Sequence, residues 1–186
     1  MVFSSFEFLF RFLPVFLVIY YLIPKKWKNL VLFAASIAFY TVGEAGYVLL
    51  LLASVLVNYF FGRAMYQTPE EGRGKKQLLL LLAALGYDFG MLFFYKYSGM
   101  TDKLPLGISF YTFQSAAYII DVYRGGIPAE KSLVKFGTYL TMFPQLIAGP
   151  IINYSEVRLK MNGRTVTLQQ FEDGLKLLVI GLASKV

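Results

Sequence analysis

Long apolar stretches alternate with short polar segments along this chain. In GYVLLLLASVLVNYFF (46–61) the apolar residues follow one another without the spacing of an amphipathic helix, a pattern typical of a span that faces lipid. Helices are expected, because a lipid-exposed helix satisfies its own backbone hydrogen bonds. The pattern predicts helices over the approximate ranges 6–23, 29–42, 47–66, 78–97, 104–123 and 133–152, followed by a last apolar stretch from 168.

The predicted fold is an all-α, multi-pass transmembrane bundle of about five to seven helices, with residues 1–186 as a single membrane domain. Of the 186 residues, 57% are hydrophobic and 16% are charged, which leaves too few polar side chains to cover a soluble domain. The first stretch carries Glu7 and Arg11 and lacks a basic leader and a small-residue cleavage site. We therefore expect it to be retained as a span and not removed as a signal peptide.

Basic residues determine the expected orientation of the bundle. The net charge is +7, but the lysines and arginines lie between apolar stretches and form no continuous basic face, so nucleic acid is not an expected partner. The loop between the second and third spans offers only Glu44, whereas the two flanking loops are basic. By the positive-inside rule these two loops are cytoplasmic and the N-terminus is extracytoplasmic. Their cations are Lys25, Lys26, Lys28, Arg63, Arg73, Lys75 and Lys76.

Simple alternation fails near residue 152. It would place Arg158, Lys160 and Arg164 outside, against the positive-inside rule. The preceding stretch also contains two Pro/Gly breaks, Phe-Pro-Gln and Ala-Gly-Pro, within residues 143–150. Such backbone is tolerated at membrane depth only inside protein or beside water. We therefore expect residues 133–152 to enter the membrane and return, lining a cavity; a fully crossing, kinked helix is the alternative.

Several polar residues lie within predicted spans. Asp88 is either a functional carboxylate or a paired group facing neighbouring helices, with Gly86 and Gly90 allowing close packing. Asp121 and Arg124 are three residues apart and can pair on one helix face or contact a ligand.

Gln114 and Ser115 lie deeper in the same span, where they make hydrogen bonds between helices or line a cavity. The chain contains no cysteine and no histidine. Thiol catalysis, disulfides and histidine-centred triads or metal sites are therefore excluded within these residues.

Six segments resemble, in order, the membrane-bound O-acyltransferases, and most closely the alginate O-acetyltransferase branch. They are MVFSSFEFLFRFLPVFLVIYYLIP, LVLFAASIAFYTVG, MLFFYKY, LPLGISFYTFQSAAYIIDVYRG, MFPQLIAGPIINYSEV and FEDGLKLLVIGLASKV. The fourth and fifth segments are the specific ones. The resemblance covers nearly the whole chain and implies the N-terminal part of a larger helical bundle around a central cavity.

The resemblance implies transfer of an acyl group, in this branch acetyl, from a cytoplasmic donor to hydroxyls of a cell-surface polysaccharide. A histidine acts as general base in this family, and this chain has none. We assign no catalytic residue and no metal site, and expect no transferase activity of the polypeptide alone. The residues expected to shape the cavity wall are Gln114, Asp121, Arg124, Pro144, Gln145, Gly149 and Pro150.

The expected location is the inner or plasma membrane. The expected partners are the bilayer, the remaining helices of the same fold and extracytoplasmic polysaccharide machinery, for example a second acetyltransferase. No bound cofactor is expected, only an acyl donor that the sequence does not identify. Two other readings stay open: a non-catalytic membrane module that binds partners, and a small transporter with polar, broken segments.

Overall fold

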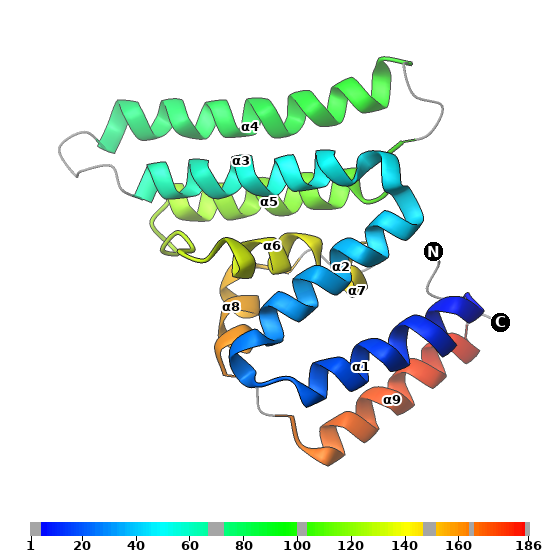
Figure 1. Ribbon diagram of the computed structural model, residues 1–186. Coiled ribbons are helices and arrows are strands. Elements are labelled where there is room, and N and C mark those ends of the chain that lie inside the picture. Colours follow the sequence, from blue (N-terminus) through cyan, green and yellow to red (C-terminus); the bar gives the residue numbers. More distant parts are fainter. Residues whose placement is uncertain (1–4, 67–72, 100–103, 147–151, 164–165, 185–186) are drawn as a thin grey trace.

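The protein is described from a computed structural model that covers residues 5–66, 73–99, 104–146, 152–163 and 166–184 (Figure 1). Every regular element in these ranges is helical. The N-terminal elements are η1 (Phe8–Phe12, a π-helical turn), α1 (Leu13–Leu22), η2 (Lys25–Trp27), α2 (Lys28–Glu44), η3 (Ala45–Tyr47) and α3 (Val48–Tyr66). They are followed by α4 (Arg73–Tyr97), α5 (Ile108–Tyr123), α6 (Leu133–Thr141), α7 (Phe143–Leu146), α8 (Tyr154–Asn162) and α9 (Leu168–Ala183).

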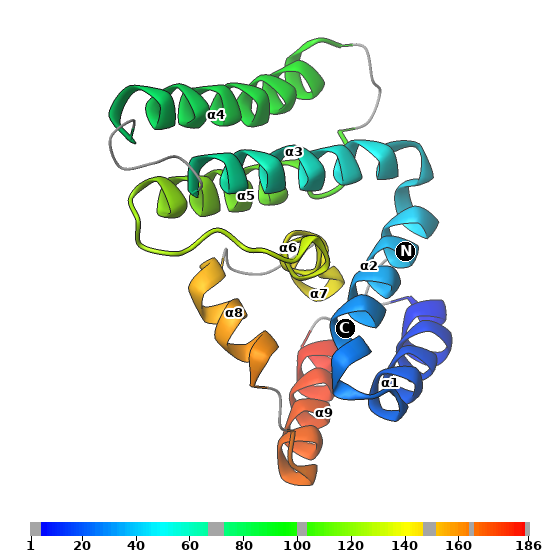
Figure 2. The same ribbon diagram turned by 60° about the vertical axis from the view of Figure 1, so that its left-hand side comes forward.

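Three long helices form one end of the molecule. α3, α4 and α5 run side by side, and each of the three contacts the other two (Figures 1 and 2). α2 leaves this layer at a sharp bend at η3, where Glu44 has non-helical backbone angles (φ −147°, ψ 56°). It runs to the opposite end, where α1 and α9 lie (Figure 2). The short helices α6 and α7 pack against α2, in the middle of the molecule.

The apolar surface of this bundle is suited to lipid. Two helical stretches, Lys25–Tyr66 and Gly74–Tyr97, are long and apolar enough to cross a membrane, and Phe8–Leu22 is a shorter apolar helix. Only 28% of the apolar window is buried in each of the two long stretches. Leu22 and Leu49 are 80% and 74% exposed. Apolar surface of this extent needs lipid or protein cover, so the expected transmembrane helical bundle is confirmed.

Helix bounds agree with the expected spans in most places. The predicted span 47–66 is α3, and the turn predicted at 43–46 separates it from α2. The fifth span begins later than expected, at Ile108, because Pro105 and the positive φ of Gly107 (73°) form a turn before it. α8 was not expected, because its sequence is polar, although Tyr154, Val157 and Met161 bury one face of it.

Two glycines allow helices to approach closely. A Cβ atom on Gly62 would lie 2.9 Å from Cε1 of Tyr118, at the contact of α3 with α5. A Cβ atom on Gly137 would lie 2.7 Å from Cε2 of Phe33, at the contact of α6 with α2. Both distances are below those of real Cβ contacts, so no larger residue fits without movement. By contrast, no described residue lies within 4 Å of such an atom on Gly86 or Gly90, so the close packing expected there does not occur between the helices that the structure describes.

Candidate functional site: the broken segment and the surfaces beside it

The segment expected to be broken does break. α6 ends at Thr141, and Met142 has extended backbone angles (φ −52°, ψ 114°) before the short helix α7 begins. Pro144 explains the break, because inside a continuous helix its ring would clash with the carbonyl four residues earlier and its missing amide hydrogen would cost a hydrogen bond, whereas the first turn of a new helix tolerates it. The amides of Gln145 and Leu146 donate to the carbonyl of Met142, each at 3.0 Å. These bonds start a new turn of helix in which the proline stands at the second position.

Phe143 holds this break in place. Its amide nitrogen donates to Oγ of Ser36 on α2 at 3.2 Å. Its ring is 96% buried and lies 5.3 to 6.0 Å, between centroids, from four other phenylalanine rings. These rings come from η1, α1 and α2, and belong to Phe8, Phe12, Phe16 and Phe39. The break is therefore a packed feature of the fold.

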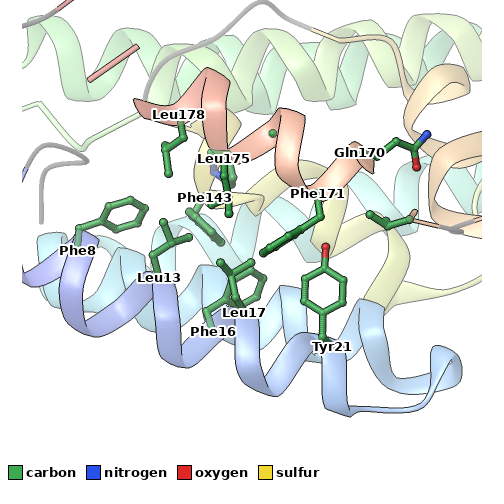
Figure 3. A pocket seen from close by; sticks show the side chains of 13 residues that line it. Phe8, Leu13, Phe16, Leu17, Tyr21, Phe143, Gln170, Phe171, Leu175 and Leu178 are labelled. Carbon is green, nitrogen blue, oxygen red and sulfur yellow. The ribbon is translucent and has the colours of Figure 1, made fainter. Parts of the chain in front are cut away.

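An apolar groove of about 520 Å³ lies beside the break, between α1 and α9 (Figure 3). Phe143 and Pro144 line it from α7, and Phe171 from α9 lies 5.4 Å from the ring of Tyr21. The other side chains in the groove are almost all hydrocarbon, with Gln170 and the hydroxyl of Tyr21 as its polar groups (Figure 3). Such a lining is suited to an apolar ligand and offers it few polar contacts.

The predicted cavity residues do not gather at this groove. Pro144 lines it, whereas Gln114, Asp121 and Arg124 are not among its lining residues. Gln114 is buried on α5, and its side-chain amide donates to the carbonyl of Tyr139 at 3.0 Å, which joins α5 to α6. Gly149 and Pro150 lie outside the described residues. Their assignment to a cavity wall, like that of the other five, stays a prediction.

Asp121 and Arg124 do not form the ion pair that their spacing allows. Both residues lie in the described part of the chain, and no salt bridge within 4.0 Å joins them. Arg124 is exposed just beyond the end of α5, where the chain turns through Gly125 with a positive φ of 76°. Solvated pairs of this kind contribute little, so nothing holds the two side chains together.

Gln145 is the predicted residue with the most unusual surroundings. Both of its side-chain polar atoms, Nε2 and Oε1, are buried and have no hydrogen-bond partner among the described residues. A buried amide without partners is destabilising, and native proteins satisfy nearly all such groups through protein, water or ligand. The break between α6 and α7 thus places an unsatisfied donor and acceptor one residue beyond Pro144.

Asp88 has a partner that the sequence did not identify. Nδ2 of Asn58 on α3 donates to Oδ1 of Asp88 on α4 at 2.8 Å and to the carbonyl of Ser54 at 3.1 Å. Asp88 is 1% exposed and Asn58 is fully buried, far from the groove in the layer of α3, α4 and α5. The reading of Asp88 as a paired group that faces a neighbouring helix is therefore confirmed.

The residues that flank the broken segment on its two sides are in contact. The hydroxyl of Tyr154, the first residue of α8, donates to Oε2 of Glu130 in the loop before α6. On α6, Oγ1 of Thr138 donates to the carbonyl of Asn29 at 3.0 Å, next to the basic residues before α2. Phe143 reaches Ser36, seven residues further along α2. α6 spans only about 14 Å, less than half of the hydrocarbon thickness. Because Glu130 before the segment and Tyr154 after it are in contact, the described part of the segment is compatible with the expected entry and return, which stays a prediction.

Glu130 organises the loop at this end. Its Oε1 accepts the amides of Lys131 at 2.8 Å and Ser132 at 2.9 Å. Its own amide donates to the hydroxyl of Tyr118 at 3.0 Å. Partial burial acts to raise the pKa of Glu130, but the bonds from Tyr154 and the two amides outweigh it, so the pKa lies below its ordinary value. Neither Glu130 nor Tyr154 was singled out from the sequence, because their contact spans 24 residues.

Comparison with known proteins gives these observations a family context. The chain is 37% identical over its whole length to the "probable alginate O-acetylase AlgI" of Pseudomonas putida, and covers 42% of that protein. It is 38% identical to the protein of the same description in Pseudomonas aeruginosa, of which it covers 39%. A peptidoglycan O-acetyltransferase of Helicobacter pylori is 28% identical, with 44% covered.

These relatives are longer than the chain, which spans about two fifths of their length. No family model matches the chain, and no solved structure matches it. The similarity to the alginate O-acetylases nevertheless includes every residue of the chain, and the H. pylori protein adds a second polysaccharide O-acetyltransferase. The chain is thus similar along its whole length to part of the alginate O-acetylases, and the expected resemblance to alginate O-acetyltransferases is confirmed.

Proposed function

We propose that this chain is the N-terminal part of a membrane-bound O-acetyltransferase. The enzyme would transfer acetyl groups from a cytoplasmic donor to hydroxyls of a cell-surface polysaccharide, with alginate as the first candidate acceptor. The observation that carries the proposal is the 37–38% identity, over the complete chain, to alginate O-acetylases of Pseudomonas. The fold is consistent with it, because a transmembrane bundle with a broken, returning segment suits a reaction between two sides of a membrane.

In this proposal the chain supplies part of the wall of the substrate cavity, and the general base belongs to another part of the enzyme. Acyl transfer to a hydroxyl needs a group that takes the hydroxyl proton as the oxygen attacks the acyl carbon. The 186 residues contain no histidine, so a histidine base would have to belong to the part of the enzyme that this chain does not include. The break at Met142 to Gln145 contributes shape, and the side-chain amide of Gln145, which has no partner among the described residues, offers a donor and an acceptor to a polar substrate or a water. Gln114, Asp121, Arg124, Gly149 and Pro150 stay candidates for the same wall.

The proposed orientation places the N-terminus outside the cytoplasm and the basic residues around Lys25–Lys28 inside. The returning segment supports it, because α8, with Arg158 and Lys160, then shares the side of Lys25–Lys28 and satisfies the positive-inside rule. The location is the inner or plasma membrane. The proposed partners are the remaining helices of the same fold and extracytoplasmic polysaccharide machinery; the donor is an acyl compound that is consumed as a substrate.

A chimera tests the activity. This chain replaces the matching segment of the P. aeruginosa alginate O-acetylase, and the acetyl content of secreted alginate is measured in a strain that lacks its own enzyme. We expect acetylation to return, and to fall at least tenfold when Phe143→Ala is added. Phe94→Ala, at a ring that is 50% exposed, is the matched control and keeps acetylation. A chimera that reaches the membrane in normal amount without acetylating alginate contradicts the proposal.

The absence of cysteine makes orientation directly measurable. Single cysteines replace Glu44 and Lys160, and intact cells are treated with a maleimide that does not cross the inner membrane. We expect labelling at position 44 and none at position 160 until the cells are opened. Labelling of position 160 in intact cells would disprove the returning topology.

A further inference from the structure

A polar pocket of about 410 Å³ lies at the end of the molecule where the broken segment begins and returns. It is formed by the loop between α5 and α6, the first turn of α6 and the C-terminal half of α8. This pocket differs from the apolar groove beside α1, because all its lining side chains except those of Pro128 and Ala129 are charged or polar. Those of interest are Glu130, Lys131, Ser132, Lys135, Arg158 and Asn162.

The charge of this pocket is unbalanced. Its lining includes three cations and one carboxylate, which gives a net formal charge of +2. The carboxylate of Glu130 is already engaged, since its oxygens accept bonds from two loop amides and from Tyr154. Arg158 forms no ion pair within the described part of the chain. An arginine beside a concave polar surface, with no carboxylate of its own, is suited to an anionic ligand.

The groups around the pocket are fixed by contacts of their own. Nζ of Lys135 donates to Oδ1 of Asn162 at 2.8 Å, which joins α6 to α8 and leaves further donors on the ammonium group. The hydroxyl of Tyr59 on α3 donates to the carbonyl of Lys131 at 2.8 Å. The loop is therefore held from α3, α5 and α8 before any ligand arrives, which lowers the entropic cost of binding.

The first turn of α6 adds to the positive potential. Oγ of Ser132 caps this nine-residue helix by accepting the amide of Lys135 at 3.4 Å. Ser132 and Lys135 both line the pocket, so the positive end of the α6 dipole faces it. A helix N-terminus together with arginine and lysine side chains is the combination that binds phosphate, a tetrahedral anion with several acceptor oxygens.

We propose that this pocket binds the phosphate group of a phosphorylated ligand, with Arg158 and Lys135 as the contacting cations. The pocket is larger than a phosphate group, so it also accommodates neighbouring atoms of the ligand. In the proposed orientation it faces the cytoplasm. On the cytoplasmic side a phosphate group can come from two sources: the headgroup of an anionic phospholipid or a soluble phosphorylated compound. The inference does not depend on acyl transfer and is tested by binding.

The first experiment titrates inorganic pyrophosphate into the purified chain, in uncharged detergent at low salt, by calorimetry. We expect saturable binding that Arg158→Gln weakens at least tenfold. Lys160→Gln is the matched control, because it removes one positive charge from an exposed site on the same helix, outside the pocket. It should change the affinity less than twofold. Absence of binding, or equal weakening by both substitutions, overturns the proposal.

Folding of the variants is checked by thermal unfolding. If Arg158→Gln unfolds, Arg158→Lys takes its place. This variant keeps the positive charge but loses the bidentate hydrogen bonding of the guanidinium group, so it should weaken binding severalfold. An unchanged affinity in that variant would count against Arg158 as a contact.

A second experiment distinguishes the two sources of phosphate. Pyrophosphate binding is measured in nanodiscs of phosphatidylcholine alone and with added phosphatidylglycerol. Competition by phosphatidylglycerol in the wild-type chain identifies a lipid headgroup as the ligand. Unchanged binding identifies a soluble compound.

Discussion

The amide of Phe143 donates to the hydroxyl of Ser36, across 107 residues of sequence, and so ties the break between α6 and α7 to the middle of α2. Ser36 is fully buried and in turn donates to the carbonyl of Leu32 at 2.7 Å. A single hydroxyl on α2 thus accepts the amide at the start of α7 and donates its own hydrogen back to α2.

Replacement of Ser36 by alanine should therefore destabilise the protein. The change leaves the buried amide of Phe143 without this acceptor, and we expect a loss of about 1–3 kcal/mol in the free energy of unfolding. Thr41→Ala is the control, because Thr41 makes the same kind of bond to the residue four before it, on the same helix, but is exposed. Unfolding in mixed micelles measures both. Equal losses would show that the bond to Phe143 contributes nothing.

Gly62→Ala tests the contact of α3 with α5. The new methyl group meets the ring of Tyr118, which cannot retreat because Phe136 and Tyr154 lie 4.7 Å and 5.1 Å from it between centroids. We expect a cost of about 1–3 kcal/mol from overpacking. Gly86→Ala, in open surroundings on α4, should change stability by less than about 1 kcal/mol. A neutral effect at position 62 would mean that the two helices are not held this close.

Asn58 and Asp88 should behave as a coupled pair. Removal of either side chain leaves the other buried without its partner, so Asn58→Ala and Asp88→Ala should each destabilise the protein. The double variant should lose less than the sum of the two, with a coupling energy of about 0.5–3 kcal/mol. Asn58→Ala combined with Thr41→Ala serves as an additive reference. Strict additivity at positions 58 and 88 would contradict the hydrogen bond between them.

Glu130 should make stability depend on pH. Its pKa is lower in the folded protein than in the unfolded chain, so its contribution is complete above the unfolded value, near 4.5, and is lost as the pH falls through the folded value. Glu130→Gln should therefore destabilise the protein at pH 7, and the difference from wild type should shrink below about pH 4.5. Unfolding from pH 3 to 7 measures this, with the exposed Glu156→Gln as control. A difference independent of pH would contradict the folded-state carboxylate network.

The positions of the membrane helices were predictable, because a membrane span requires a continuous apolar stretch of sufficient length, which can be read from the sequence. The expected span 47–66 and the observed α3 (Val48–Tyr66) differ by a single residue at one end. The break near Pro144 was also predictable, since a proline inside an apolar helical stretch interrupts the helix. α8 was missed because a nine-residue helix with a polar composition depends on its contact with the core, which only Tyr154, Val157 and Met161 make.

The partners of polar residues were not predictable in the same way. Asn58 and Asp88 are 30 residues apart, and Glu130 and Tyr154 are 24 apart. Such pairs follow from how the helices cross, which local spacing does not encode. Local spacing even suggested the wrong pair at Asp121 and Arg124, because residues three apart on a helix can meet but are not obliged to do so in solvent.

The shortness of α6 has a consequence for how the protein is made. α6 has nine residues, about half of what an insertion machinery recognises as a spanning stretch. Phe143, just after α6, donates a hydrogen bond to Ser36, and Thr138 of α6 donates one to Asn29. Both acceptors lie in α2. We therefore expect the segment to take its place only after α2 has entered the bilayer, so that insertion of the long helices precedes the packing of α6 and α7 against them.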